Sequence, residues 1–100
     1  MIMKELINII EEQIVLEGNL TSENVSEIQE DLEWALNHTS KLTIDLTYLN
    51  MLDVVGVFML LIIKKKAKAK GKIIQILNYG NEHVTHSIKL SGLQNIIDVA

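Results

Sequence analysis

Apolar and polar residues alternate along one stretch near the middle of the chain. Leu42, Ile44 and Leu46 are separated by threonine and aspartate, and this two-residue period predicts a buried strand. After a short turn, Asp53 supplies a carboxylate that can accept hydrogen bonds from the first turn of a helix. Residues 54–63 carry no charge and no hydrogen-bonding side chain. We therefore expect a helix that is deeply buried or that keeps an apolar side for another molecule.

The same reasoning predicts the other elements of one α/β domain spanning residues 1–100. Strands alternating with helices indicate a mixed, mostly parallel sheet of four to five strands with helices packed on it. Residues 42–46 should form a central strand. The core should include Ile44, Leu46, Leu60, Leu61, Ile74 and Ile76. The remaining predicted elements are a strand pair at 5–10 and 13–17 separated by Glu11 and Glu12, a break at Gly18 and Asn19, a helix from Thr21 or Ser22 to Leu36, a helix end at lysines 64–70 before Gly71, a strand at 72–77, a helix at 83–90 and a short strand around Ile96 and Ile97.

The composition argues against several classes of protein. A net charge of −4 disfavours nucleic acid as the main partner. The chain has no cysteine, which fits a reducing compartment. The first residues do not resemble a signal peptide, and the apolar run at 54–63 has about half the length needed to span a bilayer. We expect a cytoplasmic protein that does not bind nucleic acid and does not insert into membranes.

Few residues are arranged for catalysis or metal binding. The chain has no Gly-rich phosphate loop. His38 stands alone, and His83 and His86, three residues apart, are too few for a zinc site. Asp53 has a sufficient role as a helix cap, and Asp45 alternates with core residues. We expect no catalytic residue, no metal site and no cofactor; a ligand-binding or enzymatic site built from Asp45, Asp53 and the histidines is the alternative.

Two further features admit a structural and a functional interpretation. Trp34 lies opposite the apolar stripe of its predicted helix, where a loop covers it or a partner contacts it. The lysines at 64–70 suit the negative end of a helix, and a phosphate- or membrane-binding role is the second interpretation.

Short motifs follow one another in a definite order along nearly the whole chain. They are Leu16-Glu-Gly-Asn-Leu20, Ile44-Asp45-Leu46 followed by Asp53 and Gly56, Gly71 before an aliphatic strand, and Leu90-Ser-Gly92-Leu93. Their order and spacing resemble the STAS family, the domain shared by sulfate transporters and bacterial anti-sigma factor antagonists. The resemblance implies the STAS fold and a non-enzymatic, protein-binding role.

The central signature departs from the pattern of the sigma-regulating members. There it reads Asp-Ser-Ser-Gly, and the second serine is the phosphorylation switch; here it reads Asp53-Val54-Val55-Gly56. Valine has no hydroxyl group, and Phe58 stands where the family often has glycine. The resemblance implies a partner, an anti-sigma factor of the regulatory kinase type or a related regulator, that docks at the start of the helix without this switch. The expected contact residues are Asp53, Val54, Val55, Gly56, Phe58 and Met59.

Three alternatives remain for a STAS-like chain of this kind. It is a cytosolic STAS subunit of a membrane transporter, a STAS domain that binds a small ligand, or a homodimer that buries the apolar side of its central helix.

Overall fold

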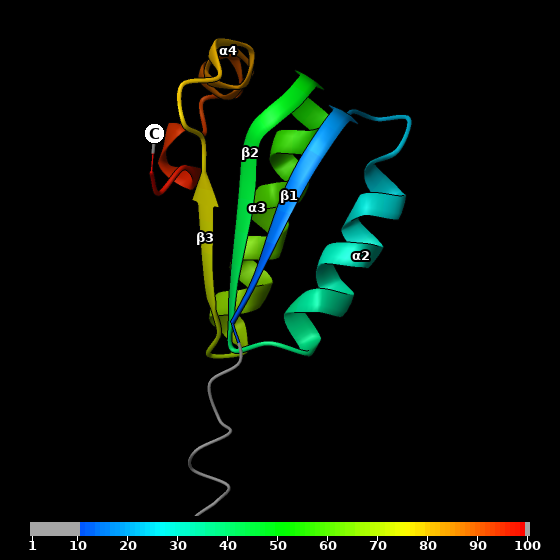
Figure 1. The fold of residues 1–100 in the computed structure, drawn as a ribbon, viewed down its shortest axis with the longest axis vertical. Helices are drawn as coiled ribbons and strands as arrows, with labels where there is room; N and C mark the ends of the chain where they lie inside the picture. Colours follow the sequence, from blue (N-terminus) through cyan, green and yellow to red (C-terminus); the bar gives the residue numbers. More distant parts are fainter. Residues whose placement is uncertain (1–10, 100) are drawn as a thin grey trace, which may run out of the picture.

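The computed structural model describes residues 11–99, which form a three-stranded parallel sheet with helices packed on it (Figure 1). The strand order is β1-β2-β3, so β2 is the central strand, as the sequence predicts. The strand count is below the predicted four to five, and the strand predicted at 5–10 lies outside the described residues. The elements are β1 (Glu11–Leu20), α2 (Val25–Asn37), β2 (Lys41–Leu52), α3 (Val54–Ala69), β3 (Ile73–Leu77), α4 (Glu82–Ser91) and the 3-10 helix η1 (Gln94–Ile96).

The core lies between the sheet and the helices, chiefly α3. Figure 1 shows α3 behind the sheet, α2 beside β1, and α4 near the end of β2. Of the predicted core residues, four are buried and two are partly buried against the core. The buried ones are Ile44, Leu46, Leu60 and Ile76, and the partly buried ones are Leu61 and Ile74.

Strand β2 continues well beyond Leu46, where the sequence predicted a turn. Val15 pairs with Asp45 but Glu17 pairs with Tyr48, so one extra residue enters β2 between the two pairs, and a second enters further on. Each such bulge shifts the alternation by one position. The buried residues therefore run Leu46, Leu49, Leu52 at intervals of three, a spacing that does not read as a strand.

The bulged half of β2 still pairs with β1, but on its other side it is held by Asn81 instead of β3. Pairing with β3 ends at Asp45, and beyond it the Asn81 Nδ2 group donates to the carbonyl oxygens of Thr47 and Leu49, both at 2.8 Å. The Oδ1 atom of Asn81 accepts from the backbone N–H groups of His83 and Val84 and so caps α4. One side chain therefore joins the start of α4 to the end of β2.

The start of the described chain differs from the prediction in two ways. Glu11 and Glu12 lie inside β1, and β1 also continues through Gly18, which adopts a φ of 77° next to the second register shift. Helix α2 begins at Val25 instead of Thr21 or Ser22, because the Oδ1 atom of Asn24 accepts from the Thr21 N–H and closes a turn there.

Asp98 and Val99 lie along the outer edge of β3. The strand predicted around Ile96 and Ile97 is wrong: η1 occupies this place, and a single parallel bridge joins Val99 to Leu77. The Asp98 N–H donates to the Ile76 carbonyl at 2.8 Å, and the Asp98 carboxylate accepts from the Ile76 N–H at 2.7 Å. The same carboxylate pairs with Lys64 of α3 at 2.9 Å.

The other boundaries follow the prediction closely. Helix α3 ends just before Gly71, whose φ is 69°, and both β3 and α4 lie where the pattern placed them. None of the helices in residues 11–99 has the length and apolar character needed to cross a bilayer.

Leu46→Ala tests the placement of the central strand. Leu46 is fully buried, so we expect the free energy of unfolding in urea to fall by about 2–5 kcal/mol. The matched control is Leu90→Ala, because Leu90 is largely exposed and its truncation should cost less than about 0.5 kcal/mol. Equal losses for the two variants would contradict a core position for Leu46.

Candidate functional site

Asp53 links three parts of the molecule at the end of β2. Its Oδ1 atom accepts from the Gly56 N–H at 3.0 Å and so caps α3, as predicted. Its Oδ2 atom accepts from the backbone N–H of Ser22 at 2.9 Å, in the loop between β1 and α2. The Asp53 N–H donates to the carbonyl oxygen of Leu20 at 3.2 Å. Because both carboxylate oxygens are engaged, Asp53 acts as a positioning residue in this arrangement.

Gly56 lets the first turn of α3 lie directly against the ends of β1 and β2. A Cβ atom at this position would lie 2.9 Å from the Leu20 side chain, the Leu20 carbonyl oxygen and the Leu52 side chain. Such distances are too short for a carbon contact, so any other residue would push α3 away from the sheet. Gly56 is buried and contributes by packing; it offers no side chain to a partner.

A row of exposed apolar side chains begins at this capped end. Val54, Phe58 and Ile62 are spaced four residues apart, so they share one side of α3, and Val55 lies beside them. These side chains, together with Met51 from β2, are between 41% and 55% exposed. We call this set the α3 patch: Met51, Val54, Val55, Phe58 and Ile62.

The α3 patch only partly matches the residues expected from the sequence. Val54, Val55 and Phe58 are exposed there, but Met59 is 2% exposed and faces the core, because it lies next to Leu60 on the buried side of α3. Met51 and Ile62 were not foreseen. The spacing of Ile62 from Phe58 was visible in the sequence, whereas Met51 required knowing that β2 reaches α3.

The residues of the alternative enzymatic site are not brought together. Asp53 lines one open hollow with Asn19 and Ser22, while His83 and His86 line another with Glu82. Asp45 is buried in the sheet, where its Oδ1 atom accepts from the Thr47 N–H at 2.9 Å. Within the described residues, no three histidine, aspartate or glutamate side chains are grouped so that they could hold a metal ion.

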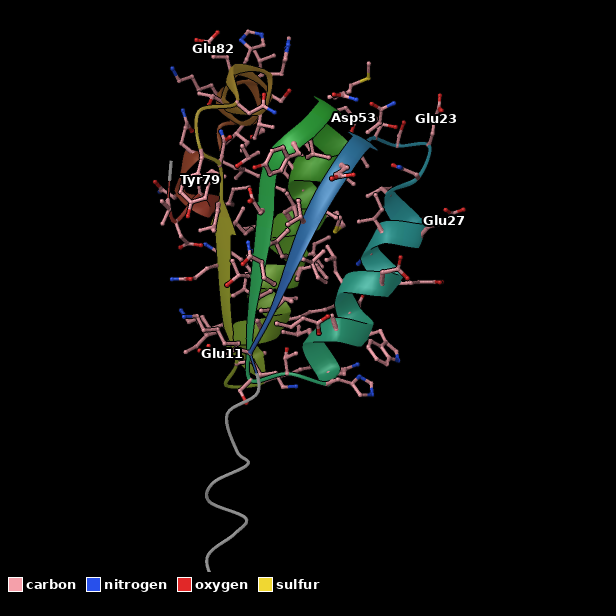
Figure 2. All side chains as sticks on the ribbon, in the orientation of Figure 1. Glu11, Glu23, Glu27, Asp53, Tyr79 and Glu82 are labelled. Atoms are coloured by element: carbon pink, nitrogen blue, oxygen red, sulfur yellow. The ribbon has the colours of Figure 1, made fainter. Side chains whose placement is uncertain are left out.

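Figure 2 shows where this site lies on the molecule. Asp53 and Glu23 are at one end, together with the start of α3, and Glu11 is at the opposite end. Tyr79 lies on the side of the molecule where β3 is, away from Asp53.

Comparison with known proteins identifies one family. The family model described as "Mlab, STAS domain" matches residues 8–98, which is most of the chain. No curated protein matches the sequence significantly.

Several solved structures share the fold. The anti-sigma factor antagonist SpoIIAA in its unphosphorylated form is 21% identical with a TM-score of 0.73, covering 94% of this chain and 83% of that one. An anti-sigma factor antagonist from Mycobacterium paratuberculosis is 18% identical with a TM-score of 0.76, covering 89% and 75%. The Bacillus cell fate determinant SpoIIAA in its phosphorylated form is 20% identical with a TM-score of 0.66, covering 94% and 86%. At these identities the likeness concerns the fold.

Substitutions of Asp53 test the double role of its carboxylate. Asp53→Ala removes both hydrogen bonds and should lower the free energy of unfolding by about 2 kcal/mol. Asp53→Asn keeps a capping oxygen but turns an NH2 group toward Ser22, so about half of that loss is expected. Urea denaturation measures both values. If Asp53→Asn were as destabilising as Asp53→Ala, the cap would not be the stabilising contact.

Gly56→Ala tests the close approach of α3 to the sheet. Although alanine is the better helix former, the added methyl group meets atoms at 2.9 Å, so a loss of about 1–3 kcal/mol is expected. The control is Ser26→Ala on the exposed part of α2, which adds no clash and should be neutral. A gain in stability for Gly56→Ala would show that α3 lies further from Leu20 and Leu52.

Proposed function

The chain belongs to the STAS domain family, and from that premise we propose that it is a non-enzymatic domain that binds a protein partner through the α3 patch. The observation that carries this proposal is the row of exposed apolar side chains at the capped start of α3. Exposed apolar side chains that share one side of a helix are typical of a surface that binds another protein.

The position of the patch adds support. It includes Val54 and Val55, which together with Asp53 and Gly56 form the segment that corresponds to the signature of the sigma-regulating members. Asp53 and Gly56 fix the first turn of α3 from beneath, so the exposed side chains are presented on a rigid element. A preorganised apolar surface loses little freedom when it is covered, which favours binding.

We propose that the partner is a cytoplasmic regulatory kinase-type anti-sigma factor or a related regulator. The similar solved structures named as anti-sigma factor antagonists support this class of partner. The finer identity of the partner rests on the family resemblance and on the α3 patch.

We further propose that this binding has no phosphorylation switch at the start of α3. Val54 and Val55 have no hydroxyl group, and no acidic residue lies in the first turn. The exposed side chains of that first turn are consequently apolar, so binding should not depend on ATP or on a cognate kinase.

The same two valines favour a second candidate, a STAS subunit attached to a membrane transporter. Such a subunit needs a contact surface but no phosphorylation cycle at residue 55. Co-purification from the native cell separates the two candidates, because the first predicts a kinase-like regulator and the second predicts the ATPase subunit of a transporter.

Substitutions of Val55 test the proposed interface once that partner is in hand. Val55→Asp places a carboxylate in the first turn of α3, where the helix dipole favours it, so the fold should be retained. In the complex the carboxylate would be buried unpaired, so affinity should fall by at least about 3 kcal/mol, on the order of 100-fold. Val55→Ser should bind nearly as well as the original chain. Calorimetric titration with and without ATP measures these affinities.

Tyr79→Asp is the matched control, because Tyr79 is similarly exposed but lies away from Asp53. It should bind the partner normally. Unchanged affinity of folded Val55→Asp would rule out the α3 patch as the interface. If the original chain were a dimer that Val55→Asp converts to a monomer, the patch would instead serve self-association.

A further inference from the structure

The end of the molecule opposite Asp53 carries an exposed tryptophan. Trp34 lies near the end of α2 with 62% of its surface exposed, and within the described residues no loop covers it. Its ring stacks on the ring of His38, with centroids 4.0 Å apart and an angle of 21° between the planes. The Nδ1 atom of His38 lies 2.7 Å from the Trp34 carbonyl oxygen, which can only accept, so Nδ1 donates this bond. The stack therefore holds the indole at the surface.

Two lysines from the end of α3 contact the same turn of α2. Lys66 pairs with Glu33 at 2.7 Å, and Lys70 contacts the Asn37 Oδ1 atom at 2.6 Å. The hydrogen bond from Lys66 lowers the pKa of the Glu33 carboxyl, and the charge of Lys70 adds to this effect. Residues on both sides of Trp34 are thus in contact with lysines.

Four lysines at this end form no ion pair with a carboxylate of residues 11–99, although Glu33 and Glu11 lie at the same end. Lys64 and Lys66 have carboxylate partners, but Lys70 meets an amide oxygen and Lys72 meets the Leu36 carbonyl oxygen. Lys65 and Lys68 are exposed, and no carboxylate of residues 11–99 lies within ion-pair distance of either. We call this end of the molecule the basic end: Trp34, His38, Lys65, Lys68, Lys70 and Lys72. Lys68 lies one turn after Lys64 and so extends it to the side of α3 away from α2.

The geometry points to the basic end as a peripheral docking site for a bilayer surface that contains anionic lipid headgroups. Uncompensated lysines are drawn to such a surface, and their aliphatic stems allow the charges to adapt to mobile headgroups. Tryptophan favours the boundary between headgroups and hydrocarbon, and an exposed indole beside lysines is typical of that boundary.

The residue types favour lipid over an acidic protein surface. All basic residues of the chain are lysines, and protein interfaces are depleted in lysine but enriched in arginine. A bilayer requires no fixed geometry from each cation, whereas bidentate recognition of a carboxylate uses the fork of arginine.

The basic end adjoins the far end of the α3 patch, because Ile62 lies one helical turn before Lys65 and Lys66, but it is distant from the start of α3. Helices α2 and α3 both finish at the lower end of the molecule in Figure 1, and Asp53 lies at the upper end in Figure 2. A protein partner centred on Val54 and Val55 and a bilayer on the basic end would therefore contact opposite ends of α3.

Sedimentation of the full chain with lipid vesicles tests this inference. Binding is expected to vesicles of phosphatidylcholine mixed with phosphatidylglycerol, and not to vesicles of phosphatidylcholine alone. Trp34 is the single tryptophan, so a shift of its fluorescence to shorter wavelength would report its entry into the headgroup region. Absence of binding to the anionic vesicles, equal binding to both kinds, or binding without a shift would overturn the proposal.

Matched variants locate the binding surface. Lys70→Ala should weaken vesicle binding by about fivefold, the effect of one lysine near an anionic surface. Lys68→Ala should do the same without removing a contact to α2, so a loss of folding at residue 70 cannot explain the result. Lys89→Ala removes the same charge from α4 and should have no such effect. An equal loss in Lys89→Ala would mean that overall charge, not the basic end, is responsible.

Two further experiments distinguish lipid binding at the basic end from protein binding at the α3 patch and from binding of an acidic protein segment. Val55→Asp should bind vesicles like the original chain. The vesicle experiment can therefore succeed even if the α3 patch proves not to bind a protein partner. Soluble polyglutamate should not compete with the vesicles at equal charge concentration. Effective competition without a fluorescence shift would assign the basic end to an acidic protein segment and overturn the lipid proposal.

Discussion

The carboxylate of Asp53 is the contact on which the arrangement of the candidate site depends. One oxygen holds the first turn of α3 and the other holds the loop between β1 and α2, so a single side chain sets the position of both. Gly56 makes this possible by allowing α3 to approach Leu20 and Leu52 closely. With the base of the helix fixed in this way, Val54 and Val55 can only face outward. The exposed apolar surface is thus a result of the cap and the close packing beneath it.

The two valines change what kind of contact this position can make. A serine hydroxyl at this position can be phosphorylated and dephosphorylated. The charge of the phosphate weakens an apolar interface by repulsion and by the cost of desolvation. A valine contributes only buried apolar area, which does not respond to ATP. Under the proposed function, the fraction of bound chain is set by the concentrations of the two proteins and by their affinity.

Much of the fold was predictable because local signals agreed with one another. The alternation through Leu46, the carboxylate of Asp53 and the terminating Gly71 each have one ordinary structural meaning, and the structure confirms all three. The second half of β2 was not predictable, because two bulges change the spacing of its buried residues and Asn81, from a distant turn, replaces the missing strand partner. Burial of Met59 was not predictable either. Residues 54–63 are apolar on every side of the helix, so their sequence does not indicate which side packs against the sheet.

The C-terminal segment has a consequence for how copies of this protein meet in concentrated solution. The outer edge of a sheet normally presents free N–H and C=O groups, and another chain can add a strand there and begin aggregation. At the end of β3 these groups are taken: Asp98 occupies both the N–H and the C=O of Ile76, and the Asn78 N–H donates to Val99. The pairing of Asp98 with Lys64 fastens this segment to α3 as well. Asp98 and Val99 therefore leave less of this edge open to a strand from another copy, a protective role that their short, irregular backbone would not suggest.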